Sequence, residues 1–253
     1  MIPNDNFSKE HFYSLLKEEI REQKKSLIIW FVGIYAALTI IAILEYLYFE
    51  SGDINACVSP SNTNYIYVTF WLCFFGSIFA SFMIASMNNK SNQSTSLNSP
   101  STTLEKYLTR LFVVVILFSI EFIVALKLFD YTRMLFFSLY YSESVYPESL
   151  VEMINKCHDP VLELSVGLLI QSIFILGTTI WCKKSFLKTA VILFILFIVL
   201  AMVDSQFGLF ISRIFDNMNW LIEILIFLTL TLLNWKLGYS YFKKPEANTQ
   251  NNL

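Results

Sequence analysis

The sequence has few of the residues from which most active sites are built. Its only two histidines, His11 and His158, both lie outside the apolar stretches. This argues against an intramembrane Ser–His dyad and against a buried zinc site with several histidine ligands. The motifs G-x-S-x-G and G-x-x-x-x-G-K-[ST] are absent, so neither a hydrolase elbow nor a phosphate loop for ATP is expected. We therefore predict a chain that is not an enzyme and has no catalytic, cofactor or metal residues.

Cysteine is scarce too, and the four present are too few for a disulfide scaffold. Cys57 and Cys157 both fall in predicted outer loops, where an oxidising compartment would permit a bridge. That pairing is a hypothesis, because the sequence does not tell whether the two loops meet. Residues 1–25 contain no apolar core of about 7–15 residues, as a cleavable signal would. Basic segments interleaved with aromatic residues are missing, so no nucleic-acid partner is expected.

Long apolar stretches are what the sequence has in abundance. There are six, at residues 27–48, 65–87, 111–129, 161–181, 186–203 and 220–237. A helix rises about 1.5 Å per residue and the hydrocarbon core is about 30 Å thick, so each stretch is long enough to cross it. Lipid offers no partner to free backbone amides, which makes each stretch a predicted helix. We expect an all-α polytopic membrane protein that forms a single transmembrane domain over residues 1–253.

The basic residues indicate how these helices are oriented. Fourteen of the 18 lysines and arginines fall in the amino-terminal segment, the second and fourth loops and the carboxy-terminal tail. The positive-inside rule places those segments in the cytoplasm, so both termini are predicted to be cytoplasmic. We expect the membrane region to cover residues 27–240 and the cytoplasmic tail residues 241–253. Ordinary membrane topology explains this asymmetry more simply than the steering of a charged ligand.

The amino-terminal segment, residues 1–26, has the pattern of an amphipathic helix. Its apolar residues recur at helical spacing, at Phe12, Leu15, Leu16 and Ile20. Charged residues fill the positions between them. Such a helix would lie along the inner membrane surface before the chain turns into the membrane at Ser26. The alternative is a helix that is simply solvated.

The second loop carries a helix-start signal. Thr102 is followed three residues later by Glu105, which fits a capping box and predicts a helix from Thr103 that continues into the third apolar stretch. The residues of interest for a partner are Thr102, Leu104, Glu105, Tyr107 and Leu108. A capped helix with apolar residues at a cytoplasmic loop suits the docking of a partner protein. It could equally be just the base of the third membrane helix.

One carboxylate falls near the middle of an apolar stretch, where an ionised group is costly. Glu121 has no basic residue on its own helical face, so its partner is expected on another helix. The candidates are Gln171, Thr178 and Asn234. An interhelical hydrogen bond and a place on a substrate or proton path both remain open.

Three segments, together with the order of the parts, carry a resemblance to a known family. They are residues 12–27 (FYSLLKEEIREQKKSL), 96–111 (SLNSPSTTLEKYLTRL) and 177–190 (GTTIWCKKSFLKTA). The chain resembles the permease subunits of type-2 ATP-binding-cassette exporters, in a poorly characterised bacterial branch. The resemblance implies an amino-terminal interfacial helix, six membrane helices and a coupling helix between the second and third, at Thr102–Leu108.

The same resemblance implies a bacterial plasma membrane location and a separate cytoplasmic ATP-binding-cassette ATPase as partner. It also implies a dimer, either of two identical chains or with a similar permease. The expected function is ATP-driven export of a cargo that the sequence does not specify. The alternative is a non-transporting membrane scaffold or sensor that binds a cytoplasmic partner through the same surface.

Overall fold

The computed structural model describes residues 8–49, 63–87, 102–140, 159–181, 184–196, 198–199 and 220–250. Within these ranges nearly every residue is helical and none belongs to a β-strand. Three helices are long and apolar enough to cross a membrane, at Thr103–Thr132, Pro160–Ile180 and Trp220–Lys243. Shorter apolar helices lie at Phe70–Ser86 and Ser185–Leu196. For the described residues, the prediction of an all-helical fold with helices long and apolar enough to cross a membrane is confirmed, while the number six stays a prediction.

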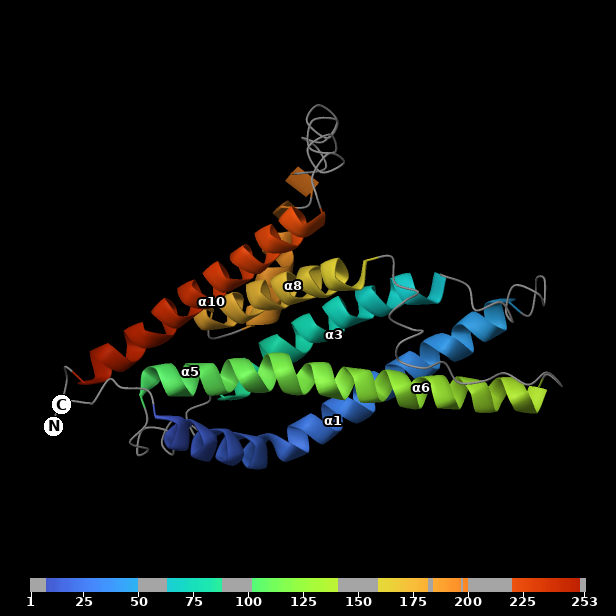
Figure 1. Cartoon of the computed structure of the whole chain (residues 1–253), viewed down its shortest axis with the longest axis horizontal. Helices are drawn as coiled ribbons and strands as arrows, with labels where there is room; N and C mark the ends of the chain where they lie inside the picture. The colour runs from blue at the N-terminus through green and yellow to red at the C-terminus, as the bar shows by residue number, and fades with distance from the viewer. Residues whose placement is uncertain are drawn as a thin grey trace.

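The elements follow one another along the chain as α1 (Lys9–Phe49), α3 (Thr63–Met87), α5 (Thr103–Phe112), η1 (Val113–Leu117), α6 (Phe118–Tyr140), α8 (Pro160–Ile180) and α10 (Trp220–Gln250). α5, η1 and α6 join without a break into one long helix, which α1 follows along one side (Figure 1). α8 packs between α3 and α10 on the other side. The starts of α1 and α5 and the last turns of α10 all lie at the same end of the bundle (Figure 1).

The amino-terminal amphipathic segment is the first part of α1. The helix does not end at Ser26, where a turn was expected, but runs on into the first apolar stretch. Figure 1 shows that the ribbon bends between its dark-blue start and its lighter second half. The apolar side of the first part, with Leu15 buried, packs against α5. Its position on a membrane surface stays a prediction.

Two helices run past the ends of the predicted apolar stretches. The third stretch was expected to end at residue 129, but α6 continues to Tyr140 because residues 130–140 contain no glycine or proline to end it. Asp130, expected at the start of a loop, is therefore inside the helix and only 1% exposed. Thr132 hydrogen-bonds Tyr35 of α1 across 2.7 Å between the two hydroxyl oxygens. α10 likewise runs past the sixth stretch to Gln250, and the predicted end of the membrane region at residue 240 stays a prediction.

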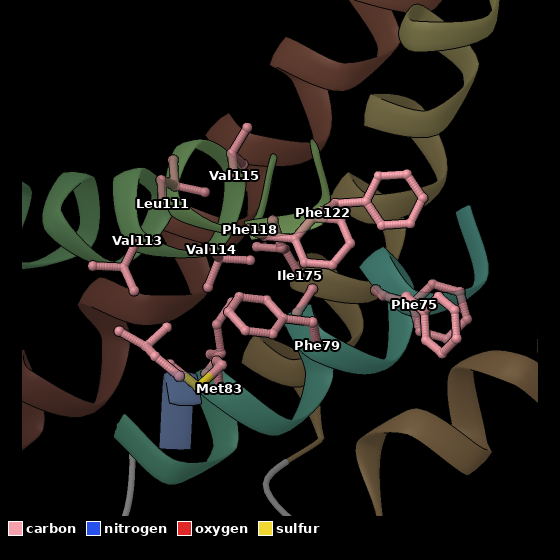
Figure 2. Close-up of a cluster of buried hydrophobic side chains, with 14 of the residues drawn as sticks. Phe75, Phe79, Met83, Leu111, Val113, Val114, Val115, Phe118, Phe122 and Ile175 are labelled. Atoms are coloured by element: carbon pink, nitrogen blue, oxygen red, sulfur yellow. The ribbon is translucent and has the colours of Figure 1, made fainter. Parts of the chain in front are cut away.

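Aromatic and branched side chains from four helices fill the core. Phe79 of α3 lies beneath Phe118, with 5.1 Å between the ring centroids, and Gly76 lets the two helices come close. Ile175 of α8 and Val114 of η1 are fully buried beside them (Figure 2). Leucine, valine and phenylalanine thus hold the bundle together by close packing, which is the main attraction available between helices in lipid.

The helix at Ser185–Leu196 is fixed against α8 by a small residue. A Cβ on Gly177 would collide with the Thr189 hydroxyl, and would come within 3.1 Å of the Thr189 Cβ. α10 is the most peripheral of the three candidate spans, because 17% of its most apolar window is buried against 44% for each of the others. Most of the apolar surface of α10 is therefore not covered by the other described helices.

Candidate coupling site at the start of α5

The start of α5 has the predicted capping box. Thr102 is the extended N-cap residue, and its hydroxyl accepts a hydrogen bond from the Glu105 amide at 3.3 Å. In return, the Thr102 amide donates to Glu105 Oε2 at 2.9 Å. Two backbone donors that a helix start would leave unpaired are thus satisfied. The prediction that a helix begins at Thr103 and runs into the third stretch is confirmed.

Glu105 makes a second hydrogen bond, which no local sequence pattern indicates. Its other oxygen, Oε1, accepts a hydrogen bond from the Ser8 amide at 2.6 Å. Ser8 caps α1, since its carbonyl accepts the first helical bond from the Phe12 amide at 3.0 Å. The Glu105 side chain is completely buried. One carboxylate therefore joins the starts of two helices, where the positive ends of both helix dipoles favour a negative charge.

Tyr107 faces α10 and not outward. Its hydroxyl donates to the Trp235 carbonyl at 2.9 Å, and its ring packs on Tyr239 and Phe242 at centroid distances of 5.6 and 5.7 Å. Gly238 makes room for it, because a Cβ there would lie 2.6 Å from the hydroxyl. Tyr107 is 5% exposed, so it anchors α5 and is not free to contact a partner.

Charged groups reinforce the same junction. The Arg110 guanidinium lies over the Phe242 ring, 4.8 Å from its centroid, a favourable cation–π arrangement. Burial raises the pKa of Glu19 on α1 above its usual 4.5, while the nearby charge of Arg110 acts in the opposite direction. α1, α5 and α10 are thus tied together at this end of the bundle.

Leu104 and Leu108 are the outward part of the predicted docking residues. They lie one turn apart on α5, and each is 36% exposed. Phe112 continues the same line and meets Phe12 of α1 edge to face, with 6.4 Å between the ring centroids. We call Leu104 and Leu108 the outer face of α5. The five predicted residues therefore divide into two outward leucines and three residues that hold the helix in place.

The polar residues inside the membrane region do not pair as expected. Gln171 donates from Nε2 to the Val114 carbonyl at 2.9 Å, and Asn234 donates to the Ser172 hydroxyl at 2.9 Å. Thr178 bonds backbone carbonyls of its own helix. Glu121 Oε2 is buried and finds no hydrogen-bond partner among the residues that the structure describes. The expected bond from Glu121 to one of these three side chains is not formed.

Two further predictions concern a disulfide and metal sites. Cys57 and Cys157, the hypothetical disulfide, lie outside the described residues. Within the described ranges, no group of three or more His, Cys, Asp or Glu residues is arranged to hold a metal ion. In comparisons with known proteins, no family model, no curated protein and no solved structure matches this chain.

Proposed function

We propose that the chain is the membrane-spanning permease subunit of an ATP-driven exporter in a bacterial plasma membrane. A separate ATP-binding-cassette ATPase would dock at the cytoplasmic end of α5 and carry out the hydrolysis. All six apolar stretches would span the membrane, with both termini in the cytoplasm. Because six helices are few to enclose a path, two such chains, identical or similar, would form the complete translocation unit.

The observation that carries the proposal is the way α5 is held. Its inner side is fixed to α1 through Glu105 and to α10 through Tyr107. Its outer face presents Leu104 and Leu108. α5 also continues without a break into α6, and this long helix is one of those able to cross a membrane. A partner that pushes on the outer face would therefore move a membrane helix directly.

The test is to charge the outer face and leave the anchoring residues intact. We expect Leu104→Asp together with Leu108→Asp to give a correctly inserted protein that no longer co-purifies with the ATPase or stimulates its turnover. Two unpaired carboxylates in a desolvated interface should together cost at least about 2 kcal/mol, so affinity should fall at least roughly 30-fold. Tyr13→Asp is the matched control, because Tyr13 is 73% exposed at the same end but lies on α1.

Normal association and stimulation in the Leu104→Asp, Leu108→Asp protein would rule out docking on this face. If no ATPase co-purifies with the unmutated protein, the exporter proposal falls. A cytoplasmic protein of another kind, lost on charging the outer face but retained by Tyr13→Asp, would then establish the scaffold or sensor alternative.

A further inference from the structure

The segment η1 is a wide π-helical turn in the most closely packed part of the bundle. Val113 and Val114 are fully buried and Val115 is 8% exposed. Figure 2 shows these valines above Phe79 and Met83 of α3. A π turn holds one residue more than an α-helical turn, and such turns occur often at functional sites. This one interrupts a helix that is otherwise regular from Thr103 to Tyr140.

Gln171 of α8 supplies a hydrogen bond to this turn. Its Nε2 donates to the Val114 carbonyl at 2.9 Å, and the side chain is 5% exposed. A π turn interrupts the regular ladder of backbone bonds, so a buried carbonyl there benefits from an outside donor. Gly76 of α3 lies beside the amide, since a Cβ on it would be in ordinary contact with Gln171 Cδ, at 3.9 Å. Three elements of the bundle therefore meet at this one bond.

The helices on the two sides of η1 are fixed to different neighbours. α5 is tied to the first part of α1 through Glu105 and to α10 through Tyr107. α6 is tied to the second part of α1 through Thr132 and to α3 through Phe118. η1 lies at the boundary between these two sets of contacts, which is where one helix segment would turn relative to the other.

We infer that η1 is a rotational joint and that Gln171 is the positioning residue that sets it. This inference rests on the proposed function, because it describes how a push on the outer face of α5 would reach α6. Closing the π turn into an α-helical turn shifts the register by one residue, which corresponds to roughly 100° of rotation and about 1.5 Å of advance. Breaking the bond from Gln171 to Val114 frees the joint to make this change.

The first experiment measures the joint without any ATPase. In a chain whose four native cysteines are replaced by serine, spin labels are attached at Leu108 before the joint and at Val124 after it. Both sites are exposed, at 36% and 45%. Double electron–electron resonance on the purified full-length protein in lipid nanodiscs then gives the distance distribution. Gln171→Leu removes the donor at nearly constant volume, and Ser172→Ala is the control, since it removes the neighbouring interhelical bond to Asn234.

We expect a single narrow distance in the parent and in Ser172→Ala, and a second distance in Gln171→Leu. Interhelical hydrogen bonds in membranes have modest strength, so the minor population should rise roughly 3- to 20-fold. A distribution in Gln171→Leu that equals the parent's overturns the inference. Because this readout needs no partner, it stands or falls independently of whether an ATPase docks at all.

Deletion of Val115 tests the joint in the opposite sense. With the extra residue gone, we expect the turn to close as an α-helix, in which the Val114 carbonyl accepts a regular backbone hydrogen bond. Adding Gln171→Leu to this deletion should then leave the label distance unchanged, which is a non-additive result. Where the ATPase binds, the deletion protein should still co-purify with it but fail to stimulate its turnover. Full stimulation by the deletion protein would show that the joint has no part in coupling.

Discussion

Among single residues, Glu105 makes two hydrogen bonds that a glutamine in its place could not both make. A carboxylate offers two acceptor oxygens, and here each accepts one hydrogen bond, from the amides of Thr102 and Ser8. A glutamine has one acceptor oxygen and a donor NH₂ group, so it can cap α5 or α1 but not both. The usual equivalence of Glu and Gln in a capping box therefore does not hold at this position.

We predict that Glu105→Gln destabilises the protein by about 1–3 kcal/mol, the usual cost of leaving a buried donor unpaired. Ser8→Pro removes the amide donor at the start of α1 and leaves the capping box of α5 intact. Ser8→Ala, which keeps the amide, is its control. Hydrogen exchange should accelerate in the first turn of α1 in Ser8→Pro and not in Ser8→Ala. Equal exchange in the two Ser8 variants would contradict the bond to Glu105.

Glu19 gives a prediction of pH dependence. Its pKa is raised above 4.5 mainly by burial, so the folded protein binds this proton more tightly than the unfolded chain. Its contribution to stability is therefore greatest below pH 4.5 and is lost as the pH rises through the raised value. Glu19→Gln should remove that dependence and raise the Tm at pH 7, which thermal unfolding across a pH series measures.

At the level of elements, α10 packs closely against α5 at Gly238, where the absence of a side chain leaves room for Tyr107. Tyr107 fits against Gly238, and the glycine is required because a Cβ would overlap the tyrosine hydroxyl. We expect Gly238→Ala to cost about 1–3 kcal/mol by forcing Tyr107 to move. Gly33→Ala is the control, since nothing lies within 4 Å of a Cβ at that position. It should be neutral or stabilise α1 by up to about 1 kcal/mol.

The contact between Tyr107 and Gly238 can be checked by a double-mutant cycle. Tyr107→Phe alone loses the hydroxyl bond to Trp235 and should cost about 1 kcal/mol. In the Gly238→Ala background the same change removes the overlap, so the pair should cost less than the sum of the two single changes. Thermal unfolding of the four proteins measures this coupling. Simple additivity would mean that Tyr107 and Gly238 do not contact each other.

The positions of the helices along the chain were largely predictable from the sequence, but which side of each helix contacts its neighbours was not. Long apolar runs fix where a membrane helix lies, and the spacing of Thr102 and Glu105 fixes where α5 begins. Leu104, Tyr107 and Leu108 were predicted together as docking residues, but Tyr107 turns inward to α10. On a helix that touches both protein and lipid, apolar spacing does not separate the two environments. Nothing in the valine-rich sequence of η1 distinguishes a π turn from an α-helical turn.

The partners of polar residues were the least predictable part. Gln171 was recognised as an unusual residue inside the membrane region, but its bond goes to a backbone carbonyl of η1 and not to Glu121. The link between Glu105 and Ser8 spans 97 positions of the chain. Such bonds depend on which helices become neighbours, and local sequence patterns carry no information about that.

For the whole molecule, topology is the prediction on which the others depend. The starts of α1 and α5 share one end of the bundle with the last turns of α10 (Figure 1). We predict that single cysteines at Ser94 and Ser144, in a chain without its native four, react from opposite sides of the membrane. An impermeant thiol reagent added to intact cells should label only the cysteine at position 144. Labelling of both positions from outside would exclude the six-helix topology.

The bond between Glu105 and Ser8 also has a consequence for the order of events during synthesis. Ser8 is synthesised 97 residues before its acceptor. At typical elongation rates of about 5–20 residues per second, the first turn of α1 waits roughly 5 to 20 seconds for it. By the end of that interval α1 and α3 have been synthesised, while the Ser8 amide can still hydrogen-bond only to water. Because α10 follows α5 by more than a hundred positions, the end of the bundle where α1, α5 and α10 meet can close only after α10 has been made.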